Sequence, residues 1–288
     1  MRRIRVAVLL GALSLCRAQD AQLQEMLRTH LNTLESSPKS LAANNGAGMV
    51  LDLMGRYAEA RKYFTAAIKL SSTDAAKAQA RRALAISYGF EGDCRGAEKA
   101  DRGAYDFYLA SGDFYNAGEV ADEIGRLCLD AGDLDAASEW YRRGHEAGLA
   151  PENPGPVQSD LWNFRWAHAR ARIAARRGKH DEAVRLMAAA KAILDRGRNP
   201  EQETYFPYLE GYVAFYAGDY SGTLAALKNA SQTDPFTQCL IGQAYEHLGD
   251  TANAIAWYRQ AASAMAHSVP AAFARPFAAG RLKTIAAH

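Results

Sequence analysis

The chain has 288 residues, of which 49% are hydrophobic and 23% are charged, with 23 glycines and 9 prolines. This composition is typical of a globular protein and excludes extensive disorder. The formal net charge of +2 provides no bulk attraction for nucleic acid, so a nucleic-acid partner is not expected.

Residues 1–18 have the pattern of a signal peptide. Three arginines among the first five residues precede a short apolar run at 6–15, and Ala18 places a small residue at the expected cleavage point. The apolar run is too short to span a bilayer as a permanent helix. We therefore expect cleavage after Ala18 and export, to a periplasm or out of the cell. Two alternatives stay open: an uncleaved buried helix, and a lipid anchor on Cys16 that would tether the protein to a membrane.

Removal of this leader would change the sign of the net charge. The leader contains four of the 34 Lys and Arg residues and none of the 32 Asp and Glu residues. The remaining chain would have 30 basic and 32 acidic residues, a net charge of −2 with neutral histidines. The slightly basic character of the full chain is thus partly a property of the leader.

After a first expected helix at 19–40, which has leucines at helical spacing, one short signature recurs along the chain. It reads Gly-x-x-x-x-Ala, and aspartate often follows the glycine. The glycine can end one helix at little steric cost, the aspartate can cap the next, and the alanine allows close helix approach. The copies are Gly55/Ala60, Gly92/Ala97, Gly112/Ala117, Gly132/Ala137, Gly178/Ala183 and Gly249/Ala254, with aspartates at Asp93, Asp113, Asp133, Asp219 and Asp250.

The stretch at 236–261 has the most complete form of the pattern. Gly242 precedes the turn at Gly249, and Tyr258 follows it on the facing helix. Such a hairpin cannot bury its apolar face alone and implies neighbours of the same kind. In these features the chain resembles the tetratricopeptide repeat family, in which about 34 residues form two antiparallel helices.

The resemblance implies an all-α fold, a right-handed α-solenoid of about six antiparallel helical hairpins with N-terminal and C-terminal flanking helices. The expected organisation is a signal peptide at 1–18, an N-terminal flanking helix at 19–40, repeats one to three at 41–149, a linker at 150–157, repeats four to six at 158–267 and a C-terminal capping helix at 268–288.

In this family the first helices of successive repeats line a concave surface, so one stripe of each first helix indicates what the groove presents. The stripe is mostly acidic in repeat three, basic in repeat four, aromatic in repeat five and mixed in repeat six. The candidate partner-binding residues are Glu119, Asp122 and Arg126; Arg165, His168, Arg172 and Arg176; Tyr205, Tyr208, Tyr212 and Tyr216; and Gln243 and His247.

This stripe predicts a protein or peptide partner. Arginines pair bidentately with carboxylates, and tyrosines offer stiff, amphipathic contact area. We expect an extended segment that is acidic and aromatic, or acidic and apolar. Two other interpretations stay open: the arginines could form a solvated face paired with the acids of repeat three, and the tyrosines could pack against a neighbouring helix. A second candidate function is a lipid-anchored component similar to the repeat lipoproteins that help build bacterial outer membranes or pili.

No catalytic residue, metal ligand or cofactor is expected, because the chain has no P-loop, His-x-x-x-His, paired Cys-x-x-Cys or Gly-x-Ser-x-Gly. The competing interpretation is an enzyme with paired carboxylates such as Glu119 and Asp122. Cys94 and Cys128 lie nearly level on neighbouring antiparallel helices. A disulfide and two small buried thiols are both compatible with this placement.

Overall fold

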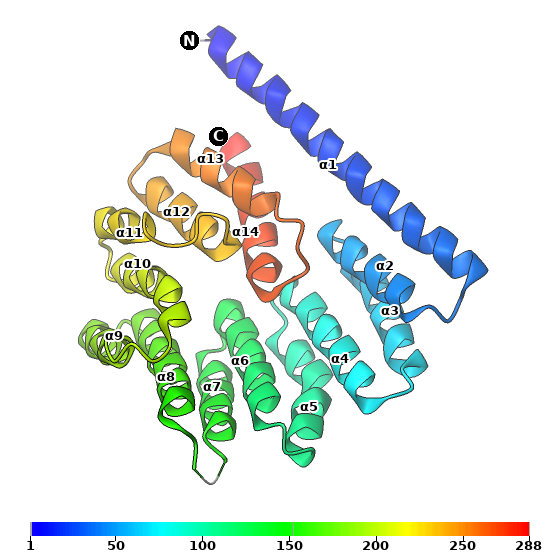
Figure 1. Ribbon diagram of the computed structural model, residues 1–288. Coiled ribbons are helices and arrows are strands. Elements are labelled where there is room, and N and C mark those ends of the chain that lie inside the picture. Colours follow the sequence, from blue (N-terminus) through cyan, green and yellow to red (C-terminus); the bar gives the residue numbers. More distant parts are fainter. Residues whose placement is uncertain (1, 152, 288) are drawn as a thin grey trace.

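The computed structural model describes the backbone of residues 2–151 and 153–287, with side chains from residue 19 onward. These residues form fourteen α-helices and one 3-10 helix, and no strand occurs among them. The helices are stacked in chain order around an arc, and the protein is an all-α solenoid (Figure 1).

Six pairs of neighbouring helices make up most of the arc. The pairs are α2 (Leu41–Leu53) with α3 (Tyr57–Leu70), α4 (Asp74–Gly89) with α5 (Cys94–Ala110), α6 (Phe114–Ala131) with α7 (Leu134–Gly148), α8 (Pro156–Arg176) with α9 (His180–Leu194), α10 (Phe206–Tyr216) with α11 (Tyr220–Leu227), and α12 (Pro235–His247) with α13 (Thr251–Ala262). The remaining elements are α1 (Arg2–Ser36), the 3-10 helix η1 (Pro200–Tyr205) and α14 (Val269–Ala286).

The first helix is continuous from Arg2 to Ser36. Leu23 and Leu27 are buried and belong to the core cluster that α1 shares with the first hairpins. The signal peptide expected at 1–18 lies outside the residues whose side chains are described, and it stays a prediction. Within the described part of the chain, no helix combines the length and hydrophobicity that crossing a membrane requires.

The sharp turns between helices depend on two adjacent residues. The turn glycines have positive φ, for example 90° at Gly132, a conformation that L side chains rarely adopt. The next residue, Asp133, accepts a hydrogen bond from the Ala136 amide at 3.0 Å and caps α7. The same cap occurs at Asp93, Asp113, Asp219 and Asp250.

A buried tryptophan docks repeat four on repeat three. Trp162 in α8 is fully buried, and its ring lies against Gly118 of α6 and Gly148 of α7. A Cβ atom at either glycine would overlap the indole. These two glycines are therefore required by close packing rather than by a turn.

The C-terminal helix packs against the last repeat and against helices of the first three repeats. It contacts α12 and α13 beside it, and also α4 and α6 (Figure 1). Arg275 of α14 donates to the Leu53 carbonyl at the end of α2 and to the carbonyls of Ala262 and Ala264. The capping helix expected at 268–288 thus joins the last repeat to the first three.

The segment before α14 forms a buried polar contact with the first repeat. The His267 Nε2 atom lies 2.8 Å from the Asp52 carboxylate, which also accepts a hydrogen bond from Ser87 at 2.9 Å. Burial raises the pKa of Asp52, and the hydrogen bonds from His267 and Ser87 oppose that rise. The contact fixes residue 267 on the inner side of the arc.

A second buried acid lies in α5. Asp101 is 1% exposed, and neither of its carboxylate oxygens has a hydrogen-bond partner among the described residues. Burial raises the pKa of this carboxyl well above its usual value, so the neutral acid is favoured. An uncharged Asp101 can occupy a position where repeats of this kind usually have a large apolar residue.

Candidate functional site

The inner side of the arc contains a cavity of about 860 Å³, which we call the central cavity. Its wall comes from eight helical elements and from the loops that precede α12 and α14. The lining includes Ile86 of α4; Glu119, Asp122, Glu123 and Arg126 of α6; Tyr141 of α7; Phe164, Arg165, His168 and Arg172 of α8; Gln202, Thr204, Tyr205 and Tyr208 of η1 and α10; Phe236 and Thr237 of α12; and residues 267–270.

Eight of the thirteen candidate residues line this cavity: Glu119, Asp122, Arg126, Arg165, His168, Arg172, Tyr205 and Tyr208. They come from the first helices of repeats three and four and from the start of repeat five. The first helices thus supply most of the wall.

The other five candidates, Arg176, Tyr212, Tyr216, Gln243 and His247, do not line the central cavity. Arg176 donates to the Leu129 carbonyl at 3.1 Å and lies over the Tyr216 ring. Tyr212 is buried between Tyr208 and Tyr216, at ring distances of 5.8 and 4.8 Å.

The two candidates of repeat six are engaged with their own neighbours. Gln243 donates to the Cys239 carbonyl one turn earlier, at 3.4 Å. His247 stacks on Tyr220 with the ring centroids 4.3 Å apart. Neither residue lines the central cavity, so a role of these two side chains in partner binding stays a prediction.

Arg126 is held between a carboxylate and two aromatic rings. Its Nε donates to Asp130 at 3.1 Å and its Nη2 to the Tyr208 hydroxyl at 2.9 Å. The guanidinium carbon lies 3.4 Å from the centroid of the Phe236 ring. Such stacking is favourable for arginine, so α6, α10 and α12 are joined at this point of the wall.

Arg165 at the other end of the wall pairs with Glu119 and lies over the Trp162 ring at 4.8 Å. One candidate interpretation assigned the arginines of repeat four to pairs with the acids of repeat three. That interpretation describes Arg165, but Arg172 has a different environment.

Arg172 is 5% exposed and has no carboxylate partner among the described residues. Its Nη2 donates to the Tyr141 hydroxyl at 3.0 Å. Its Nε and Nη1 atoms are buried without a hydrogen-bond partner. Buried nitrogens without a hydrogen-bond partner are destabilising, so a ligand oxygen that accepted from Nε and Nη1 would remove this cost.

Two neighbouring groups have shifted pKa values. Burial raises the pKa of Asp122 to about 7, although Arg165 and Arg172 oppose the rise. Burial and the positive charges of Arg172 and Arg126 lower the pKa of His168 well below its usual value. At neutral pH His168 is therefore an uncharged group, and Asp122 is close to its titration midpoint.

The family model described as tetratricopeptide repeat matches residues 41–74 and 237–264. The first segment covers the α2–α3 hairpin, and the second covers most of the α12–α13 hairpin. The chain is a tetratricopeptide repeat protein. Repeats of this family in general form non-catalytic scaffolds that bind protein partners.

Two solved structures are similar to this tetratricopeptide repeat protein. A tetratricopeptide repeat protein from Parabacteroides merdae aligns with a TM-score of 0.52 at 15% identity, over 92% of this chain and 93% of that chain. A chain of the APC/C hetero-tetramer Cut9-Hcn1 aligns with a TM-score of 0.44 at 15% identity, over 92% of this chain and 46% of that chain. The first likeness concerns the fold alone. No curated protein matches the chain.

Several lining residues of this tetratricopeptide repeat protein lie outside the predicted stripe. Tyr141 belongs to a second helix, and Phe164 precedes the arginine stripe by one residue. Residues 267 and 268 come from the loop into α14, residues 269 and 270 begin that helix, and none of the four belongs to a repeat. Phe236 also lines the cavity, and it lies on α12 seven residues before the candidate Gln243.

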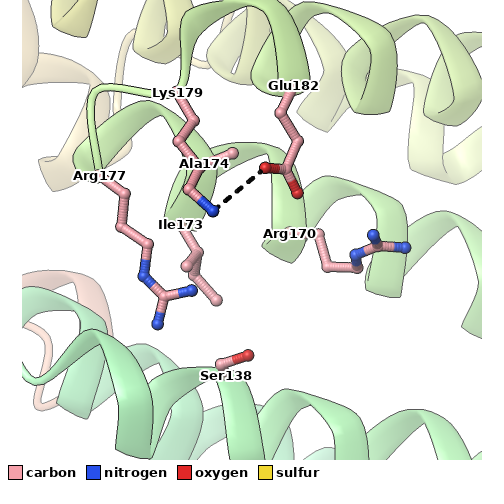
Figure 2. Close-up of a pocket in the computed structure, with 7 residues that line it drawn as sticks. All are labelled: Ser138, Arg170, Ile173, Ala174, Arg177, Lys179 and Glu182. Atoms are coloured by element: carbon pink, nitrogen blue, oxygen red, sulfur yellow. Dashed lines mark ion pairs between the residues drawn. The ribbon is translucent and has the colours of Figure 1, made fainter.

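A second, much smaller hollow of about 60 Å³ lies between α7 and the α8–α9 hairpin. Figure 2 shows Arg170, Arg177 and Lys179 around it, with Ser138 below them. Lys179 pairs with Glu182 at 3.6 Å, and Arg177 pairs with Asp135. Most of its charge is therefore already compensated. Among the described residues, no group of three His, Cys, Asp or Glu side chains is placed to hold a metal ion.

Proposed function

We propose that this protein is a non-catalytic scaffold that binds a segment of a partner protein in the central cavity. The observation that carries the proposal is the gathering of aromatic and charged side chains, Tyr205, Tyr208, Phe236, Arg126 and Arg172, around one hollow. Tyrosine and arginine are the residue types that most often dominate protein recognition. The repeat fold supports this reading, because the family in general binds proteins.

The size of the cavity favours a short segment. Its volume of about 860 Å³ lies within the range of ligand pockets and is far too small for a folded domain. Residues 267–270 form one wall, so a bound chain would meet α14 rather than run on along an open groove. We therefore infer that a chain end or a tight loop of the partner enters the cavity.

A peptide selection tests the proposal. Peptides are selected from a random display library on the chain beginning at residue 19, and their affinities are measured by fluorescence anisotropy. Tyr205→Ala removes a side chain that is 55% exposed at the cavity. Because exposed tyrosines contribute strongly to such contacts, we expect a loss of about tenfold or more in affinity.

The matched control is Val184→Ala on α9, which removes a side chain that is 50% exposed and does not line the cavity. This variant is expected to bind the selected peptides unchanged. Peptides that bind both variants as well as the unaltered chain would contradict binding in the central cavity.

We further propose that the protein is exported and that residues 1–18 are its leader. The disulfide between Cys94 and Cys128 supports this, because disulfides persist mainly in oxidising compartments. Mass spectrometry of the exported protein should find an N-terminus at residue 19, and an intact Met1 would contradict cleavage. Membrane fractionation of Cys16→Ala separates a free protein from a lipid-anchored one, since only the anchored form would lose its membrane fraction.

A further inference from the structure

Arg172 and Asp122 line the central cavity without an ion-pair partner among the described residues. Three arginines from α4, α6 and α8 each pair with a carboxylate. The pairs are Arg82–Glu123, Arg126–Asp130 and Arg165–Glu119. Within the described residues, Arg172 and Asp122 form no ion pair with each other or with any third group. The wall therefore holds one unpaired cation and one acid that is only partly ionised at neutral pH.

Two arginines of the cavity wall, Arg126 and Arg172, differ in whether a carboxylate is bound to the guanidinium. Arg126 has a carboxylate, a hydroxyl and an aromatic ring as partners. Arg172 is 5% exposed and has only the Tyr141 hydroxyl and ring. A guanidinium that is out of water without a carboxylate is costly, and an anionic ligand group would remove that cost.

We propose that Arg172 binds a carboxylate group of the ligand and that Asp122 takes up a proton when this group enters. The inference rests on the proposed function, because it names the chemistry that the same cavity selects. The carboxylate can belong to a chain end or to an acidic side chain, and both present the same two oxygens to the guanidinium.

The proton follows from the position of Asp122. It lines the cavity with Arg172, and burial already raises its pKa to about 7. A second carboxylate nearby would repel the ionised form of Asp122 and raise the pKa further. Binding near neutral pH would thus add a proton to those molecules in which Asp122 is ionised.

Other ionisable side chains of the wall have contacts of their own. His168 is kept uncharged by burial and by two arginines. Asp234 caps α12 through the Thr237 amide at 3.0 Å, and His267 contacts the buried Asp52. Glu119 and Glu123 are held by their arginines. Asp122 differs from these groups because, among the described residues, its side chain forms no ion pair and no hydrogen bond.

The test uses three small probes and isothermal titration calorimetry. N-acetyl-phenylalanine carries a terminal carboxylate, N-acetyl-aspartyl-phenylalaninamide carries one on a side chain, and N-acetyl-phenylalaninamide is the neutral match. At about pH 6 we expect at least one carboxylate probe to bind about tenfold or more tightly than the neutral amide, as a charge-assisted hydrogen bond to a buried arginine implies. Which of the two binds better identifies the source of the carboxylate.

Two variants and one control test whether Arg172 and Asp122 cause the preference for carboxylate probes. Arg172→Met is expected to abolish the preference for the carboxylate probes over the neutral amide. Arg170→Met is the control, because Arg170 is an exposed arginine of the same helix that does not line the cavity. Asp122→Asn mimics the protonated acid, so above about pH 7 it is expected to bind the carboxylate probes more tightly than the unaltered protein does.

Proton uptake has its own readout. Near pH 7 the apparent binding enthalpy is measured in phosphate and in Tris, whose ionisation enthalpies differ. We expect the enthalpy to depend on the buffer for the unaltered protein and much less for Asp122→Asn.

Three outcomes would overturn the inference: equal affinity for acid and amide on the unaltered protein, an equal loss in Arg170→Met and Arg172→Met, or no binding of any probe at millimolar concentration. Buffer-independent enthalpy would overturn proton uptake. If Arg172→Met fails to fold, the acid and amide comparison on the unaltered protein still decides. If library-selected peptides respond to Tyr205→Ala while acids show no preference, the scaffold function stands and the carboxylate site does not.

Discussion

The disulfide between Cys94 and Cys128 allows a quantitative prediction of stability. It joins the first residue of α5 to the end of α6 across a sequence separation of 34 residues. A cross-link that closes a loop of this length lowers the entropy of the unfolded chain by about 13 cal/mol/K, or about 4 kcal/mol at 25 °C. We therefore expect Cys94→Ala combined with Cys128→Ala to reduce the free energy of unfolding by about 2–4 kcal/mol.

Urea unfolding followed by circular dichroism, with and without dithiothreitol, measures this effect. The reductant is expected to lower the unfolding midpoint of the unaltered protein and to leave the double variant unchanged, which controls for other actions of the reductant. In the chain beginning at residue 19, unfolding without reductant should expose one reactive thiol, that of Cys239. Three reactive thiols, or a midpoint that ignores the reductant, would refute the reasoning.

Four further predictions concern single side chains. Trp162→Ala should cost about 3–5 kcal/mol in urea unfolding, because the indole is fully buried between two helices. Arg275→Met should speed hydrogen exchange of the α14 amides, since the Leu53 carbonyl loses its donor. Asp101→Asn should raise the free energy of unfolding at pH 7 by about 1–3 kcal/mol, because it removes a buried acid without partners and keeps its shape. Because the pKa of Asp122 is raised, the folded protein keeps a proton that the unfolded chain releases near pH 4. The free energy of unfolding should therefore fall as the pH rises from about 4 to about 7. In a series of urea titrations at different pH values, Asp122→Asn should remove the part of this fall that Asp122 causes.

The helices and their turns follow from local chemistry that a sequence shows directly. A glycine with positive φ and an aspartate that caps the next amides need no information from distant residues. At Gly132 and Asp133, for example, both features depend on residues within four positions of the turn. That is why the hairpins of the solenoid can be predicted from the chain alone.

The composition of the cavity wall depends on geometry that the repeat pattern does not carry. The stripe rule places Tyr208 and Tyr212 on one face of α10, one turn apart, but only Tyr208 lines the cavity. Tyr212 is buried against the neighbouring rings of Tyr208 and Tyr216 and belongs to the core. The rotation between successive repeats decides which turn of each helix faces the ligand, and it is set by packing between hairpins.

The contacts of Trp162 give a second example. The sequence identifies a tryptophan near the start of a helix, but its two glycine partners lie 44 residues before it and 14 before it, at Gly118 and Gly148. Neither glycine belongs to the recurrent turn signature. A glycine that admits a ring cannot be told from a glycine that weakens a helix until the partner helix is placed.

Because α14 packs against both the last repeat and the first repeats, the shape of the central cavity depends on residues far from repeats three to five. In an open solenoid each repeat contacts only its neighbours, so stability and binding are local properties. Here Arg275 and His267 bring the C-terminal segment onto α2, and residues 267–270, at the start of α14, form part of the cavity wall. Loosening that segment would remove a wall of the cavity without altering any residue of repeats three to five. Substitutions at residue 275 should therefore weaken ligand binding as well as stability, a coupling between distant parts of the chain that an open array of the same hairpins would lack.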